Sequence, residues 1–153
     1  LRRSSAASDV YKRQSLGYVH SKYKNLISDL TGDFIIDALD YALEVPRAAP
    51  LTYSFGFNID GNLGTWRSIT RISYYHRDKS YYNENNQGFI NEQDILNFGY
   101  DIYSSDGKIN IGIYGKNLSN EVKHGGDTNL SFGGTFAPLA KGKIVGAELV
   151  YKF

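Results

Sequence analysis

The chain has 153 residues, a net charge of +1, 13 Tyr, 16 Gly and no Cys. This is enough for one domain with a core. The near-neutral charge argues against a nucleic-acid partner, and the absence of Cys excludes disulfides and thiolate metal sites. No apolar run approaches the ~18 residues of a spanning helix, but a membrane β-barrel also lacks such runs, because alternate residues of its strands face away from lipid. Met is absent too, so we expect a fragment of a longer protein.

The first fourteen residues, 1–14, show no hydrophobic period and contain four basic residues beside a Ser/Ala patch. No apolar stretch of the kind found in a signal peptide follows them. The segment 9–14 resembles the translation of a transposon-end adaptor used in sequencing libraries. We therefore interpret 1–14 as a non-native leader or adaptor scar, and expect the fold to lie within 15–153.

Residues 15–24 are rich in Tyr and strand-like, and a long connection follows over 25–49. Acidic residues recur there at helical spacing: Asp33, Asp37, Asp40 and Glu44. Apolar residues form the other side of this pattern, so we predict a short amphipathic helix on a loop. Carboxylates on one helix face do not encircle an ion as a calcium loop does, and we expect a solvated face instead.

The segment 51–60 carries the clearest strand pattern, with unbroken alternation of apolar and polar residues. Its apolar positions are Leu51, Tyr53, Phe55, Phe57 and Ile59. A period of two predicts a strand with one apolar and one polar face. Residues 60–64 have the composition of a turn.

The next predicted strand, 65–77, offers two competing faces, one with Arg67 and Arg71 and the other with Trp66 and Ile72. An Arg on the lipid face near the bilayer midplane costs roughly 2–4 kcal/mol. We therefore predict that Arg67 and Arg71 point into the lumen of a barrel, with Trp66 in the membrane interface.

Two more strands are predicted over 93–104 and 108–117, joined by the tight-turn residues 105–107. The residues expected to face outward are Leu96, Phe98, Tyr100, Ile102, Ile109, Ile111 and Ile113. The connections 78–92 and 118–142 are long and polar, and we predict loops there.

The closing segment, 143–153, alternates to the last residue. Its outward row is Val145, Ala147, Leu149, Tyr151 and Phe153. About ten such residues, tilted, span a bilayer. The predicted connections alternate between long and short, as in outer-membrane barrels, where extracellular loops are long and periplasmic turns short. The sequence thus predicts an all-β, antiparallel up-and-down meander of about six strands, a fragment of a transmembrane β-barrel whose smallest closed form has eight.

Three segments also carry a family resemblance. Tyr114–Glu121, with its Asn117-Leu118 pair, is similar to the segment after the penultimate strand of TonB-dependent outer-membrane receptors. The ending 146–153 resembles their final strand, and 46–50 resembles a strand entry in that family. The resemblance therefore identifies 15–153 with the C-terminal part of such a receptor's barrel.

This resemblance implies active import across the outer membrane of a Gram-negative bacterium. A plug domain would fill a barrel of about 22 strands, energy would arrive through the TonB complex, and the substrate would be a ferric siderophore or a similar scarce nutrient. The plug would lie upstream of these residues. The family also implies that the row from Val145 to Phe153 is read by the barrel-assembly machinery. A porin-like barrel without TonB, or a soluble β-sandwich binding module, are alternatives; an upstream plug would favour the receptor over the porin.

No residues suggest catalysis, a metal site or a cofactor, because neither a Ser/His/Asp grouping nor a carboxylate pair stands out. The three histidines lie far apart: His20, His76 and His124. We expect them at the surface or the membrane interface. Asp78, Asp127 and the Asn-rich run 83–86 could contact a substrate from the outer loops, although solvated loop residues are the default.

Overall fold

The computed structural model describes residues 9–123, 128–130 and 134–153. The fold is nearly all β, with 51% strand and 4% helix. No helix within these ranges is long and apolar enough to cross a membrane. The elements in chain order are β1 (Asp9–Tyr18), α1 (Ala38–Ala42), β2 (Leu51–Leu63), β3 (Trp66–Arg77), β4 (Ser80–Tyr81), β5 (Phe89–Ile90), β6 (Gln93–Tyr103), β7 (Ile109–Lys116), β8 (Thr128–Leu130), β9 (Gly134–Phe136) and β10 (Ile144–Tyr151).

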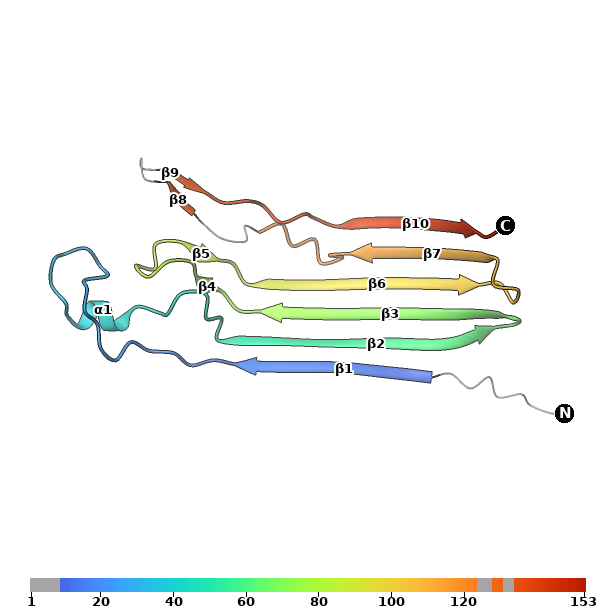
Figure 1. The fold of residues 1–153 in the computed structure, drawn as a ribbon, viewed down its shortest axis with the longest axis horizontal. Coiled ribbons are helices and arrows are strands. Elements are labelled where there is room, and N and C mark those ends of the chain that lie inside the picture. Colours follow the sequence, from blue (N-terminus) through green and yellow to red (C-terminus); the bar gives the residue numbers. More distant parts are fainter. Residues whose placement is uncertain (1–8, 124–127, 131–133) are drawn as a thin grey trace.

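Six long strands form one antiparallel sheet in the order β1-β2-β3-β6-β7-β10 (Figure 1). Each of them pairs with the next long strand along the chain. The short strands form two separate hairpins, β4–β5 and β8–β9, inside two long connections. The predicted antiparallel meander is confirmed, and the open sheet is consistent with a piece of a barrel.

The strand register continues the apolar rows from strand to strand. Phe55 in β2 lies opposite Tyr74 in β3, with their rings stacked at 5.1 Å between centroids. Ile72 lies opposite both Phe57 and Phe98. Directly opposed residues point to the same side of a sheet. The register thus gathers one set of residues on one side, here called the apolar face: Leu51, Tyr53, Phe55, Phe57, Ile59, Trp66, Ile72, Tyr74, Leu96, Phe98, Tyr100, Ile102, Ile109, Ile111, Ile113, Val145, Ala147, Leu149 and Tyr151.

No second layer covers the apolar face within the described ranges. The sole buried apolar side chain there is Ile90, in a loop hairpin. Leu149 is 72% exposed and Val145 is 68% exposed. The expectation that these outward residues would be more exposed than a soluble core allows is therefore confirmed. Because burying one large apolar side chain is worth about 1.5–3 kcal/mol, covering this face with an apolar phase would be strongly favourable.

The first strand differs from the prediction. It spans Asp9–Tyr18 and not 15–24, and its first six residues pair with β2 from Asp60 back to Phe55. The physical reason is that β2 extends to Leu63, so its edge offers backbone groups that an antiparallel partner satisfies. The interpretation of 1–14 as an adaptor scar stays a prediction.

The predicted helix shrinks to the single turn α1. Asp37 caps it, since its Oδ1 accepts a hydrogen bond from the Leu39 amide at 2.7 Å. Asp40 closes a capping box by accepting from the Asp37 amide at 3.0 Å. Its other oxygen accepts from the Leu30 and Thr31 amides at 2.7 and 2.9 Å. Asp40 is fully buried, so the expectation of a solvated acidic face is wrong for this residue, which instead binds the amides of its own loop.

The connections alternate between short and long, as predicted. Both short turns contain a left-handed glycine, Gly64 with φ 66° and Gly107 with φ 69°, which a Cβ would disfavour. The first turn is tighter than predicted, because residues 60–63 still pair within β2. The three long connections lie together at the opposite end of the sheet (Figure 1), here called the loop end.

Candidate functional site: the polar face and the loop end

The side of the sheet opposite the apolar face carries Arg67 and Arg71, and is here called the polar face. Arg67 Nε donates to both carboxylate oxygens of Asp60 at 3.0 and 3.1 Å. Arg71 forms an ion pair with Asp101. The two arginine side chains are 59% and 49% exposed, so water screens both pairs and each adds little to stability. The pairs neutralise and orient the arginines; a barrel lumen beside them stays a prediction.

Glycines let large side chains lie flat on the polar face. An added Cβ at Gly146 would come within 2.6 Å of the Tyr114 ring, and one at Gly112 within 2.6 Å of the Asp101 carboxylate. Tyr114 and Asp101 therefore each lie over a glycine of the next strand. The result is a hollow of about 820 Å³ on this face, with Arg13, Asn58, Arg71, Asn97 and Lys116 among its polar lining.

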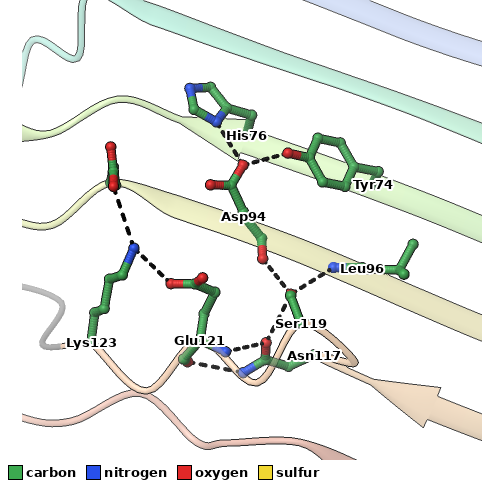
Figure 2. A network of polar contacts seen from close by, with 9 residues as sticks. Tyr74, His76, Asp94, Leu96, Asn117, Ser119, Glu121 and Lys123 are labelled. Carbon is green, nitrogen blue, oxygen red and sulfur yellow. Dashed lines mark hydrogen bonds and ion pairs between the residues drawn. The ribbon is translucent and has the colours of Figure 1, made fainter.

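Asn117, part of the family-like segment, fastens the base of the connection that follows β7 (Figure 2). Its Nδ2 donates to the backbone oxygens of Glu121 and Lys141 at 3.0 and 2.9 Å. Its Oδ1 accepts from the Glu121 amide at 2.9 Å. Asn117 is 7% exposed and has φ 50°, a left-handed conformation that Asn tolerates better than most residues. One buried side chain thus holds both ends of the long loop.

Leu118 and Ser119 extend the pairing between β6 and the chain beyond the end of β7. The Leu118 amide donates to the Leu96 oxygen at 2.7 Å. Ser119 Oγ accepts from the Leu96 amide at 3.3 Å and donates to the Asp94 oxygen. A Cβ added at Gly115 would come within 2.6 Å of the Leu118 side chain, so glycine at 115 leaves room for this leucine. The Asn-Leu-Ser segment is therefore a structural clamp at the loop end.

His76 joins two strands at the loop end. Its Nδ1 lies 2.8 Å from Asp94 Oδ1, and its Nε2 lies 3.0 Å from Asp78 Oδ1. The Tyr74 hydroxyl donates to the same Asp94 oxygen (Figure 2). The Tyr53 ring stacks on the imidazole at 4.6 Å between centroids. In the sequence His76 stands far from the other histidines and from Asp94. The antiparallel register of β3 and β6 places it opposite Asp94, and the apolar alternation of both strands is the signal that could have helped to align them.

The long connections also bind one another. Glu44 and Asn86 exchange two hydrogen bonds, amide to Oδ1 at 2.8 Å and Nδ2 to carbonyl at 2.9 Å. The Arg47 guanidinium lies 4.7 Å from the centroid of the Tyr82 ring. Lys123, after β7, reaches Glu92 in the second connection at 3.5 Å. It also pairs with Glu121 of its own connection at 2.9 Å, and this pair raises the lysine pKa. The connection before β2 and the one between β3 and β6 therefore pack together. Within the Asn-rich run, Asn86 has a structural role.

Of the remaining histidines and loop aspartates, two lie within the described residues and two outside them. Asp78 contacts His76, and His20 is exposed. His124 and Asp127 lie outside the described residues. In the described part of the chain, no group of three or more His, Asp or Glu residues is arranged to hold a metal ion.

The row predicted as an assembly signal lies on the apolar face of β10. Tyr151 is 53% exposed, and the ring of Phe153 packs edge-on against it at 5.2 Å between centroids. In the described sheet β10 pairs with β7 and forms an edge. Its other side therefore presents backbone donors and acceptors to which a strand can be added.

Comparison of the chain with protein families, curated proteins and solved structures finds no match.

Proposed function

We propose that this chain is a wall segment of an outer-membrane β-barrel, and that the barrel is a TonB-dependent receptor importing a ferric siderophore or a similar scarce nutrient. The observation that carries the barrel assignment is the division of one open sheet into an exposed apolar face and a polar face with paired arginines. A barrel wall needs this division, because one side meets lipid and the other meets water or a plug.

The positions of the connections support the same proposal. Short turns lie at one end of the sheet and three long connections at the other. In outer-membrane barrels the short turns are periplasmic and the long loops extracellular. The loop end would then face the outside of the cell, where its hydrogen-bonded loops could meet an incoming solute.

The receptor assignment rests on the resemblance of the segment around Asn117-Leu118 and of the ending at Phe153. The clamp that Asn117 forms supplies a physical reason for an Asn at this place, since its side chain satisfies three backbone groups in a left-handed turn. Plug and TonB-contacting segment would be contributed by chain upstream of these residues.

A porin-like barrel is the second candidate, and the open hollow of about 820 Å³ on the polar face fits it equally well. The two candidates differ in what lies upstream, a plug domain or further strands. A soluble β-sandwich is less well supported, because in the described residues the apolar face has no second sheet against it.

The test uses the complete gene in a Gram-negative host. The proposal expects the protein in the outer membrane, loop-end cleavage by protease added to intact cells, and uptake of a labelled ferric siderophore that is lost when TonB is deleted. Uptake by diffusion that survives TonB deletion would replace the receptor with the porin. Recovery of the protein in the soluble fraction would overturn both.

A further inference from the structure

The loop over residues 25–46 lies beyond the loop end of the six-stranded sheet (Figure 1), and it carries exposed apolar side chains. Ile27 is 97% exposed, Phe34 is 96% exposed and Ile35 is 63% exposed. Leu39 adds another at 61%. These four residues are here called the apolar crest. Exposed apolar groups concentrated on one element mark an interaction surface, whereas isolated ones are ordinary. The crest lies on the loop and not on the apolar face, so lipid contact with the sheet does not account for it.

Hydrogen bonds within the loop hold the crest in place. The Asp29 carboxylate accepts from the amides of Gly32 and Phe34 at 2.8 and 2.6 Å. The Tyr41 hydroxyl accepts from the Leu26 amide at 3.3 Å. Together with the buried Asp40, these bonds close the loop on itself. The crest is therefore presented by an ordered loop and loses less entropy on binding than a flexible one would.

Phe34 is the least expected residue of the crest. Its φ is 70°, a left-handed conformation that is strained for a bulky residue and free of strain for glycine. Local stability would thus favour Gly here, and a fully exposed Phe adds nothing to the packing of the loop. Strain of this kind at an exposed residue points to a role other than the folding of the loop.

Charge identifies what kind of partner fits. Between residues 25 and 46 the sequence has five acidic residues, Asp29, Asp33, Asp37, Asp40 and Glu44, and no Lys or Arg. An anionic lipid surface would be repelled by this loop. A second copy docked through the same loop would bring eight like charges together, twice the four carboxylates of one loop that are not buried. A partner with apolar groups among basic ones meets no such penalty.

We propose that the apolar crest is a docking surface for a polypeptide that combines apolar anchors with Lys or Arg. Phe34 is the central anchor, and the acidic residues around it, chiefly the exposed Asp33 and Asp37, attract the basic groups and exclude anionic partners. This inference rests on the loop alone and holds whether the barrel is a receptor or a porin.

The test measures binding of fluorescent peptides to the full chain in neutral, non-ionic micelles. Three peptides of equal length are compared, one of Leu and Lys, one of Leu and Glu, and one of Ser and Lys. The leucine–lysine peptide is expected to bind, and the other two to bind at least roughly tenfold more weakly, because each lacks one half of the recognition. Failure of the leucine–lysine peptide to bind, or equal binding of the leucine–glutamate peptide, would overturn the proposal.

Variants separate binding from folding. Phe34→Gly removes the anchor and relieves the left-handed strain, so it is expected to weaken binding roughly tenfold or more while leaving the loop as protected from protease as before. Unchanged binding by this variant would sink the proposal. Leu39→Ser supplies a second anchor variant should Phe34→Gly disturb the loop.

The charge variants come next. The pair Asp33→Asn and Asp37→Asn removes two charges but keeps the side-chain oxygens that accept from Ile35 and Leu39. It is expected to weaken binding severalfold and to flatten its dependence on salt. Glu148→Gln removes one exposed charge on β10, away from the loop, and should change nothing. An effect per charge equal to that of the Asp33 and Asp37 pair would mean that net charge alone sets the binding, which contradicts a docking surface on this loop.

Discussion

The two faces of the sheet lie on opposite sides of the same strands, from β2 to β10, yet their side chains differ in what surrounds them. On the apolar face, aromatic and branched side chains from neighbouring strands stack on one another, as Phe55 does on Tyr74, and remain exposed. On the polar face, charged side chains find partners, as Arg71 does in Asp101, and glycines make room for them. Among the described residues nothing covers the apolar face. This asymmetry is the basis of the proposal that lipid covers it.

The largest expected effect comes from moving a charge across the sheet by one residue. In the membrane-inserted barrel, Ile72→Arg places a guanidinium on the apolar face and should cost roughly 2–4 kcal/mol of unfolding free energy. Ser73→Arg places it on the polar face and should stay within about 0.5 kcal/mol. Denaturant titration of both variants in lipid vesicles measures the difference. Equal costs would remove the distinction between the faces.

The end of β10 offers a second contrast between adjacent residues. In the full-length protein, Phe153→Ala or deletion of Phe153 should lower outer-membrane levels severalfold. The Phe153 ring packs on Tyr151 and ends the exposed side-chain row of β10, which a strand added to this edge would contact. Lys152→Ala should do much less. Membrane fractionation with protease accessibility gives the levels. If both substitutions cause the same loss, general stability and not a read signal explains the row.

A smaller effect is expected from crowding the polar face. Gly146→Ala would bring a Cβ within 2.6 Å of the Tyr114 ring, and should cost roughly 1 kcal/mol, at the low end for overpacking because the ring can tilt towards solvent. Gly99→Ala is the control, since its nearest contact would be an ordinary 3.5 Å to Arg71 Nε. Adding Tyr114→Ser should abolish the cost at Gly146; a cost that persists in the double variant would mean that the ring is not its cause.

The smallest expected effect lies outside both faces, at Asp40. Hydrogen bonds from the Asp37 amide, and then from the Leu30 and Thr31 amides, hold the pKa of this carboxyl below its ordinary value. Its stabilisation of the loop is therefore present above the unfolded-state pKa of about 3.9 and is lost as pH falls through the lower folded value. As pH falls through the folded pKa of Asp40, the rate of amide hydrogen exchange over residues 26–41, corrected for intrinsic rates, should rise.

Asp40→Asn is the control for this titration. The variant cannot ionise, so exchange over the same residues should be faster at neutral pH and show no step in acid. A step that survives in the Asn variant would assign the acid sensitivity to another group, such as Asp29.

Much of this architecture follows from alternation alone. The run from Leu51 to Ile59 specified a two-faced strand, and the cost of an arginine in lipid placed Arg67 and Arg71 on the correct side relative to Ile72. Pairing partners beyond the alternating stretch were not predicted, because 9–14 has no period and its place in β1 depends on the edge of β2. The buried state of Asp40 was missed for a related reason: its partners are backbone amides, which carry no sequence signature.

The sequence indicated which residues form the clamp after β7, but not what they contact. The resemblance singled out Asn117 and Leu118, but their role depends on contacts with Leu96 and Lys141, which only the folded chain brings together. The His76–Asp94 contact follows from the register of β3 and β6, which alternation alone does not specify. Local chemistry was thus easier to predict than contacts between segments.

The central claim is that the apolar face meets lipid and the polar face does not. In the full-length protein, with Trp66 and any further Trp replaced by Phe, a Trp placed at Ile72 or at Ser73 reports one face alone. The measurement is fluorescence quenching of these two variants, in the inserted protein, by lipids brominated along their acyl chains. The account predicts strong quenching at position 72 and little at position 73; equal quenching, or none at 72, would contradict it.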